Sequence, residues 1–127
     1  MYIPHLEVSQ VRNLKSLKTD CHPLANIIYG INGSGKTSLL EAIYLLGRGR
    51  SFRHRDLRLV VNHQAEELVV SAKIEKGMPA KVHQMGVRRT SSGKFAARFD
   101  GKTLQSSVQL ASELPLQLID AHSFNLL

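Results

Sequence analysis

A chain of 127 residues can build one domain with a hydrophobic core but not two. Its single cysteine, Cys21, excludes an internal disulfide, and no apolar run reaches the roughly 18 residues that cross a membrane. Lys and Arg outnumber Asp and Glu by 17 to 10, and the resulting net charge of +7 attracts polyanions. Residues 1–7 lack the features of a secretory signal, so we expect a cytoplasmic protein with no membrane partner. Charge alone leaves nucleic-acid binding open.

The first part of the chain predicts three β-strands. Residues 3–11 alternate apolar and polar side chains, as a strand with one buried face does. Residues 14–19 favour a second short strand with weaker alternation. Residues 25–29 form a compact β-rich run that stops at Gly30, which is typical of a strand buried on both faces.

One helix and a β meander are predicted next. Residues 36–46 are apolar nearly all the way round, which predicts a central, covered helix that Gly47 and Gly49 end. Asp100-Gly101 is a pair typical of a tight turn. The other predicted elements are strands at 67–75, 80–89 and 94–101, a helix at 103–112 and a strand at 116–119. This order indicates an α/β fold with a β-α core and an antiparallel β meander.

Residues 30–37, Gly-Ile-Asn-Gly-Ser-Gly-Lys-Thr, satisfy the phosphate-loop pattern G-x-x-x-x-G-K-[ST] in full, between a predicted strand and a helix. The glycines let backbone N–H groups face phosphates, and the helix N-terminus adds donors. Lys36 is expected to reach the β- and γ-phosphates of ATP, and the Thr37 hydroxyl to bind Mg²⁺. The alternative is a glycine-rich turn with a solvated lysine. The predicted nucleotide-binding residues of the loop are Gly30, Ile31, Asn32, Gly33, Ser34, Gly35, Lys36, Thr37 and Ser38.

ATP hydrolysis needs more groups than this phosphate-binding loop provides. An acidic residue must help to hold Mg²⁺, and another group must orient the attacking water. Asp120, after the apolar run Leu116 to Ile119, is the nearest match to such an acid, although a carboxylate there also suits a cap or a turn. The sequence therefore predicts ATP binding without hydrolysis by this chain alone.

Three segments carry a family resemblance: "VRNLKSL" (11–17), "GINGSGKTSLLEAIYLLGRGRSFR" (30–53) and "LPLQLIDAHSFNLL" (114–127). On these, the chain resembles the N-terminal part of the RecF family, recombination-repair ATPases related to SMC and Rad50 heads. The resemblance implies that residues 1–127 are lobe I of an ABC/SMC-type P-loop NTPase head. That lobe is incomplete, because the family's signature motif and Walker B acid have no counterpart here.

The resemblance also implies further site residues. Arg12 and Asn13 match an Arg-Asn pair that lies near the nucleotide, although a turn at a strand end is the alternative. Gln117 matches the Q-loop glutamine that bridges Mg²⁺ and the attacking water. Ala121-His122 stand where the family usually has Pro-Glu-like residues.

Basic residues follow the predicted helix. By resemblance, Arg48, Arg50, Arg53 and Arg55 are expected to face double-stranded or gapped DNA, with Arg58 nearby; a solvated face or a contact with an adjacent lobe is the alternative. A solvated role is favoured for the basic residues of the meander, which are Lys81, Arg88, Arg89, Lys94, Arg98 and Lys102. The six histidines are dispersed along the sequence, so no zinc site is predicted. Cys21 is expected to be unreactive. Glu41 is expected to pair with a group at the helix start.

The implied biology is DNA replication and repair, including RecA loading at single-stranded gaps with RecO and RecR and the SOS response. In the family, ATP is held between the phosphate loop of one subunit and the signature motif of another, which makes dimerisation ATP-dependent. Two alternatives stay open. One is another SMC- or Rad50-like ATPase head, and the other is a non-enzymatic basic DNA-binding fragment with a vestigial loop.

Overall fold

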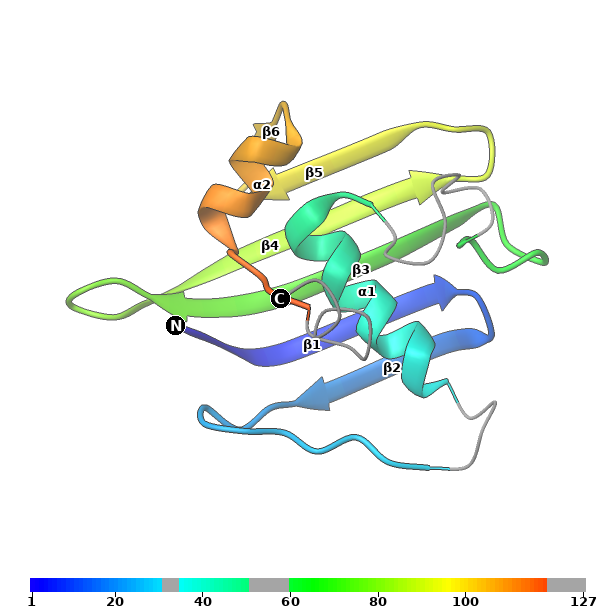
Figure 1. The fold of residues 1–127 in the computed structure, drawn as a ribbon. Coiled ribbons are helices and arrows are strands. Elements are labelled where there is room, and N and C mark those ends of the chain that lie inside the picture. Colours follow the sequence, from blue (N-terminus) through cyan, green and yellow to red (C-terminus); the bar gives the residue numbers. More distant parts are fainter. Residues whose placement is uncertain (31–34, 51–59, 119–127) are drawn as a thin grey trace, which may run out of the picture.

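The computed structural model describes residues 1–30, 35–50 and 60–118, which build one antiparallel sheet with two helices on one of its faces (Figure 1). Within these residues the sheet has six strands in the order β2-β1-β3-β4-β5-β6. The strands are β1 Tyr2–Val11, β2 Leu14–Asp20, β3 Glu67–Lys76, β4 Lys81–Thr90, β5 Phe95–Phe99 and β6 Lys102–Leu104. The helices are α1 Lys36–Arg48 and α2 Ser107–Glu113. Neither of these two helices has the length and apolar character needed to span a bilayer.

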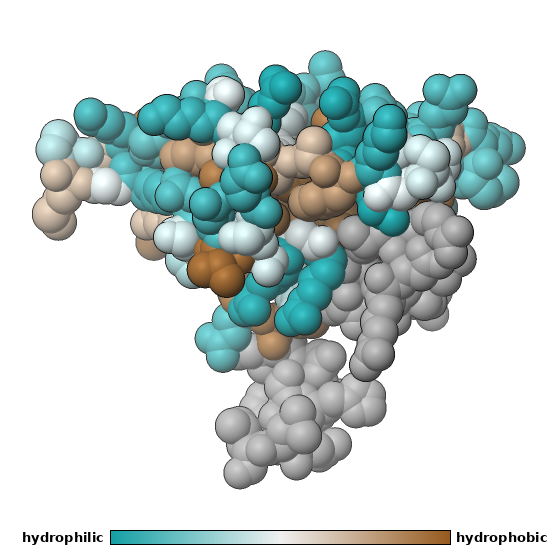
Figure 2. All heavy atoms as spheres, turned by 90° about the horizontal axis from the view of Figure 1, so that it is seen from above, coloured by the Kyte–Doolittle hydropathy of each residue, from teal (hydrophilic) through white to brown (hydrophobic). Residues whose placement is uncertain are grey.

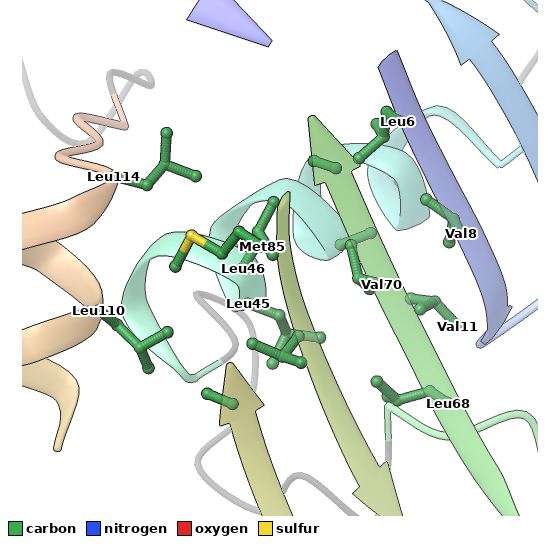
Figure 3. Close-up of a cluster of buried hydrophobic side chains, with 14 of the residues drawn as sticks. Leu6, Val8, Val11, Leu45, Leu46, Leu68, Val70, Met85, Leu110 and Leu114 are labelled. Atoms are coloured by element: carbon green, nitrogen blue, oxygen red, sulfur yellow. The ribbon is translucent and has the colours of Figure 1, made fainter. Parts of the chain in front are cut away.

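The hydrophobic core fills the space between the sheet and the helices. Alternation along β3 buries Leu68, Val70, Ala72 and Ile74 on the side that the helices cover. Figure 3 shows side chains from β1, β3 and β4 meeting Leu45 and Leu46 of α1 and Leu110 and Leu114 at α2. This packing fixes α1 against the sheet and so places its first residue, Lys36.

The predicted strands at 3–11, 14–19, 67–75 and 80–89 are confirmed as β1 to β4, with ends shifted by one residue. The predicted strand at 25–29 is wrong. Its residues have no regular structure, and the side chains of Ile27 and Tyr29 are 87% and 88% exposed. A strand buried on both faces needs hydrogen-bonded neighbours, and the described sheet ends at β2. Hydrogen bonds of the Asn26 side chain to the His22 backbone hold a local turn instead.

Helix α1 differs from its prediction in two respects. It continues to Arg48, because Gly47 lies inside the helix and the left-handed Gly49 (φ 70°) caps it, donating its N–H to the Leu45 carbonyl at 2.8 Å. The helix is also not covered all round. Only one face lies on the sheet, and Leu40 on another face is 44% exposed.

The C-terminal elements are shorter than expected. The predicted strand at 94–101 ends at Phe99, and Asp100-Gly101 forms the predicted tight turn, with φ of 50° and 81°. Sequence reasoning missed β6, which pairs with β5 beyond that turn. Helix α2 therefore begins at Ser107, where the Ser106 hydroxyl accepts the Gln109 N–H at 3.3 Å. Residues 115–118 have no regular structure, so the predicted strand at 116–119 is wrong over its described part.

Replacing Gly47 with alanine is expected to destabilise the fold by about 1–3 kcal/mol. At an open helical position the same change would stabilise by up to about 1 kcal/mol. Here, a Cβ would lie 2.4 Å from Leu116 Cδ1 and 2.9 Å from the Leu114 carbonyl oxygen. Urea unfolding followed by circular dichroism measures the change. In a protein that also carries Leu116→Ala, Gly47→Ala should cost less, because only the contact with the Leu114 carbonyl oxygen remains. A higher unfolding midpoint for Gly47→Ala than for the wild type would show that these contacts are not close.

Acid is expected to weaken the β4–β5 end of the sheet through Asp100. One Asp100 carboxylate oxygen lies 2.6 Å from His83 Nδ1, and the other accepts the Gln84 N–H at 2.9 Å. The hydrogen bond to His83, followed by that to the Gln84 backbone, lowers the pKa of the Asp100 carboxyl below its ordinary value. A lowered folded-state pKa means that this stabilisation is present above the unfolded-state pKa. It is lost as the pH falls through the folded-state value.

Asp100→Asn should therefore lower the melting temperature at neutral pH and flatten its decline between about pH 5 and pH 2. Asparagine tolerates the left-handed backbone of this position, so the turn is retained. Thermal melts of both proteins across this range provide the measurement. Parallel pH curves for the two proteins would show that Asp100 does not carry the effect.

Candidate nucleotide-binding site

The described residues at the N-terminus of α1 have features that favour an anion. The helix starts after Gly35, which has left-handed backbone angles (φ 99°, ψ 7°), and no side chain accepts a hydrogen bond there as an N-cap. The first turn carries no acidic residue. The N–H groups of this turn and the positive end of the helix dipole therefore face the space before the helix. No carboxylate of the first turn accepts these N–H groups in place of a bound anion. This is the geometry that the phosphate-loop pattern predicts.

The Lys36 side chain reaches back to Gly30, the first residue of the phosphate-loop pattern. Its Nζ donates to the carbonyl oxygen of Gly30 at 2.5 Å, six residues earlier in the chain. Thr37, the next residue, is exposed, so its hydroxyl is accessible to a metal ion. These two side chains and the uncapped helix start form a donor set that suits a phosphate chain with Mg²⁺. Of the predicted loop residues, Ile31, Asn32, Gly33 and Ser34 lie outside the described residues.

The β1–β2 turn lies against the first two turns of α1. Arg12 Nε and Nη2 donate to the two Glu41 carboxylate oxygens at 2.5 Å and 3.2 Å. Next to it, Asn13 Oδ1 accepts the hydroxyl of Ser38 at 2.7 Å. The structure thus brings the predicted residues Arg12, Asn13 and Ser38 together at the first two turns of α1.

Glu41 is predicted to pair at the helix start, and in the structure its carboxylate pairs with Arg12 of the β1–β2 turn. The Glu41 side chain is fully buried. The sequence does hold a signal for this. Glu41 lies three residues after the buried Ser38 and four before the buried Leu45, so it falls on the buried stripe of the helix. A carboxylate on such a stripe requires a partner.

Residues 60–62 hold the turn from its other side. Arg12 adopts a left-handed backbone (φ 50°) and donates its N–H to the Val60 carbonyl at 2.7 Å. The Asn62 side chain donates to the Arg12 carbonyl at 2.6 Å, and its backbone N–H donates to Gln10 at 2.9 Å. Asn62 is 5% exposed, and no sequence pattern indicated it. A hollow of about 270 Å³ opens here, lined by Arg12, Asn13, Val61, Asn62 and His63.

Gln117 is exposed, and within the described residues the structure locates its neighbour Leu116 against α1. Leu116 packs at Gly47, eleven residues along α1 from Lys36, or about 16 Å at the helical rise. The role of Gln117 with Mg²⁺ and water therefore stays a prediction. Asp120 lies outside the described residues.

The predicted DNA-facing arginines differ in their surroundings. Arg48 is half-buried, donates to the Leu116 carbonyl at 2.5 Å and lies over the Tyr44 ring at 5.9 Å. Arg50 and Arg48 line a hollow of about 260 Å³ beside α2. Arg53, Arg55 and Arg58 lie outside the described residues. Of the basic residues in the meander, Lys81, Arg88, Lys94, Arg98 and Lys102 are exposed, on a molecule whose upper surface is mainly hydrophilic (Figure 2).

No group of three His, Cys, Asp or Glu side chains gathers as a metal site within residues 1–30, 35–50 and 60–118. Cys21 is half-buried on the edge of the sheet. Burial, and then the Asp20 carboxylate, raise the pKa of the Cys21 thiol above its ordinary value. A raised pKa leaves less of the reactive thiolate at neutral pH.

Comparison with known proteins identifies the domain family of the chain. The family model described as "RecF/RecN/SMC N terminal domain" matches residues 2–124. The DNA replication and repair protein RecF of Pseudomonas entomophila is 43% identical over 127 residues, which cover 100% of this chain and 34% of that protein. The RecF of Azotobacter vinelandii is 44% identical over the same shares of both chains. The chain thus spans about a third of the length of these relatives.

Solved structures agree with the sequence comparison. The structure described as the recombination mediator protein RecF-ATP in the RecFOR pathway superimposes with a TM-score of 0.78 at 30% identity, covering 86% of this chain and 30% of the other. A structure from work on ATP-driven dimerisation and DNA-stimulated activation of SMC ATPases superimposes with a TM-score of 0.75 at 20% identity. The match covers 87% of this chain and 76% of the other. The second likeness concerns the fold alone. The sheet with α1 and α2 on one face is therefore shared with the RecF and SMC ATPase heads.

Proposed function

Because the chain belongs to the RecF/RecN/SMC N-terminal domain family, we propose that residues 1–127 are the ATP-binding lobe of a RecF-type DNA replication and repair ATPase. The observation that carries this proposal is the uncapped start of α1, with a left-handed Gly35 followed by Lys36 and Thr37. The fold shared with the RecF-ATP structure supports the same assignment.

In the proposed complex, the first N–H groups of α1 bind the phosphates of ATP. When ATP binds, the Lys36 ammonium would leave the Gly30 carbonyl and donate to the β- and γ-phosphates, since a phosphate oxygen is the stronger acceptor. Thr37 supplies a hydroxyl ligand to Mg²⁺, which would neutralise phosphate charge and needs few protein ligands when phosphates complete its shell. Arg12 and Asn13 border the nucleotide from the β1–β2 turn, beside the hollow formed with residues 61–63.

The proposed activity of this chain is ATP binding, with hydrolysis belonging to the longer protein. Gln117 would contribute to Mg²⁺ and water positioning there, by family resemblance. The SMC relative is described as dimerising under ATP, and we extend the same behaviour to the whole RecF-type protein. A dimer would supply from its second subunit the groups that the phosphate loop does not carry.

The proposed biological role is recombinational DNA repair in the cytoplasm. The RecF-ATP relative is described as a recombination mediator in the RecFOR pathway, so RecO and RecR are proposed partners. Loading of RecA at gaps and a part in the SOS response follow the same resemblance. The proposed DNA contacts are Arg50, Arg53 and Arg55, with Arg48 at the edge of this surface, supported by the net charge of +7.

A titration of the 127-residue chain with a fluorescent ATP analogue and Mg²⁺ tests the proposal. We expect saturable binding that unlabelled ATP displaces at much lower concentration than AMP, because the described donors converge where phosphates would lie. AMP as effective as ATP would contradict a phosphate cradle. No saturable binding at all would refute the assignment for this chain.

A second candidate is a basic DNA-binding domain whose loop is vestigial, which the surplus of Lys and Arg favours. It predicts DNA affinity that falls steeply with salt and is indifferent to ATP. Measuring duplex binding at several salt concentrations, with and without ATP, separates the two. DNA binding without any nucleotide binding would support this second candidate.

A further inference from the structure

The buried carboxylate of Glu41 is not explained by phosphate binding itself. Glu41 lies on the buried side of α1 with Ser38, Ala42 and Leu45. A buried charge is costly unless it is paired, and replacing a buried ion pair with apolar residues is often neutral or stabilising. A leucine would therefore serve packing at this position. Glu41 is better explained by the group that it holds.

That group is the guanidinium of Arg12. Its Nε and Nη2 face the two Glu41 oxygens at 2.5 Å and 3.2 Å, which is the side-on, two-point pairing of an arginine with a carboxylate. The Arg12 side chain remains 19% exposed, and Arg12 lines the hollow with Asn13 and residues 61–63. The same residue thus contacts a buried anion and reaches an open cavity.

The backbone of Arg12 is fixed as well. The Val60 carbonyl and the Asn62 side chain bind its N–H and its carbonyl, and Asn13 accepts from Ser38 of α1. Glu41 is five residues after Lys36, about 7.5 Å along the helix axis. The Arg12 charge is therefore held within about two helical turns of the phosphate-binding lysine.

We propose that Glu41 is a positioning residue that holds the Arg12 guanidinium toward the phosphates of the bound nucleotide. Glu41 itself does not contact the nucleotide and acts through Arg12. A two-point contact fixes the plane of the guanidinium, so a donor is in place before the nucleotide arrives, and less side-chain freedom is lost on binding. This inference rests on the proposed function, because it needs the nucleotide to lie at the start of α1.

The test is a double-mutant cycle in nucleotide affinity, using the same fluorescent ATP analogue with Mg²⁺. The four proteins are the wild type, Glu41→Gln, Arg12→Gln and the double variant. Each single substitution should raise the Kd about tenfold. The double variant should bind no more weakly than Arg12→Gln, since Glu41 has no effect once its arginine is gone. Glu7→Gln is the matched control and should leave the Kd unchanged, because Glu7 on β1 pairs with Lys18 on β2 at 3.3 Å, with side chains that are 40% and 72% exposed.

Three results would overturn the inference. Wild-type affinity in Glu41→Gln would show that the carboxylate does not position Arg12. If the Kd increases of the two single variants multiply in the double variant, Glu41 acts independently of Arg12 and has a general structural role. Absence of binding by the wild type would refute the proposed function, and the inference with it. If circular dichroism shows Glu41→Gln to be unfolded, Glu41→Asp decides, because it keeps the charge and Arg12 but shortens the side chain: a raised Kd in the folded protein supports positioning, and wild-type affinity overturns it.

Discussion

Replacing Lys36 with alanine is expected to weaken ATP binding by about a hundredfold or more, because in the proposed complex the ammonium would make charge-assisted contacts with two phosphates, each worth about 1.5–3 kcal/mol. The fold should be unaffected. The described contact of the Lys36 ammonium is with the Gly30 carbonyl in the loop, and the core lies on the other side of the helix. Affinity is measured by titration with the fluorescent analogue, and stability by urea unfolding.

Lys94→Ala is the matched control for this variant. It makes the same change in net charge at an exposed position next to the β4–β5 turn, far along the chain from the loop. Its ATP affinity should equal that of the wild type. Lys36→Arg gives a second comparison, because it keeps the charge but replaces a compact ammonium with a broad planar group. Unchanged affinity in Lys36→Ala would refute the site assignment.

Removing Arg12 alone is expected to destabilise the fold by about 3–5 kcal/mol, because Glu41 would lose its cation while it stays fully buried. For a small domain this is a large part of the total free energy of unfolding. Adding Glu41→Leu to Arg12→Ala should restore most of the loss, since the buried carboxylate that lost its cation is then removed. Urea unfolding of the wild type, Arg12→Ala and Arg12→Ala/Glu41→Leu gives the three values.

The matched control is Lys18→Ala, which removes the cation of an exposed ion pair with Glu7. Its cost should be within about 0.5 kcal/mol, as for most surface pairs. An Arg12→Ala cost as small as that of Lys18→Ala would mean that Glu41 does not depend on its arginine. A double variant less stable than Arg12→Ala would show that α1 needs a carboxylate at this position for packing.

Local patterns were sufficient to predict the helix and much of the sheet. The phosphate-loop spacing predicts the start of α1 at Lys36, and alternation defines β3 and β4 because each has one buried face. The strand predicted at residues 25–29 is wrong because a local pattern is not enough there. An apolar run indicates burial but does not name the neighbours that would hydrogen-bond to it, and the described sheet provides none.

The parts of the candidate site that sequence did not predict depend on contacts between distant segments. Arg12 and Glu41 are 29 residues apart, and Asn62 bonds to Arg12 across 50. No local periodicity encodes such pairs. A buried position occupied by a charge indicates only that a partner exists, and the fold decides which residue it is. The same holds for β1, whose place between β2 and β3 cannot be derived from its own alternation.

The position of β1 in the sheet has a consequence for how the chain folds. Strands β3 and β4 form a hairpin that closes over a few residues, whereas β1 pairs with β3 across some sixty residues, as Val8 with Val70. Short loops close at lower entropic cost and faster, so we expect the hairpin to form early and β1 to dock late. The turn with Arg12 and Asn13 arrives with β1, so we expect the proposed nucleotide site to be completed late in folding. Bound ATP should then slow unfolding and leave the folding rate nearly unchanged.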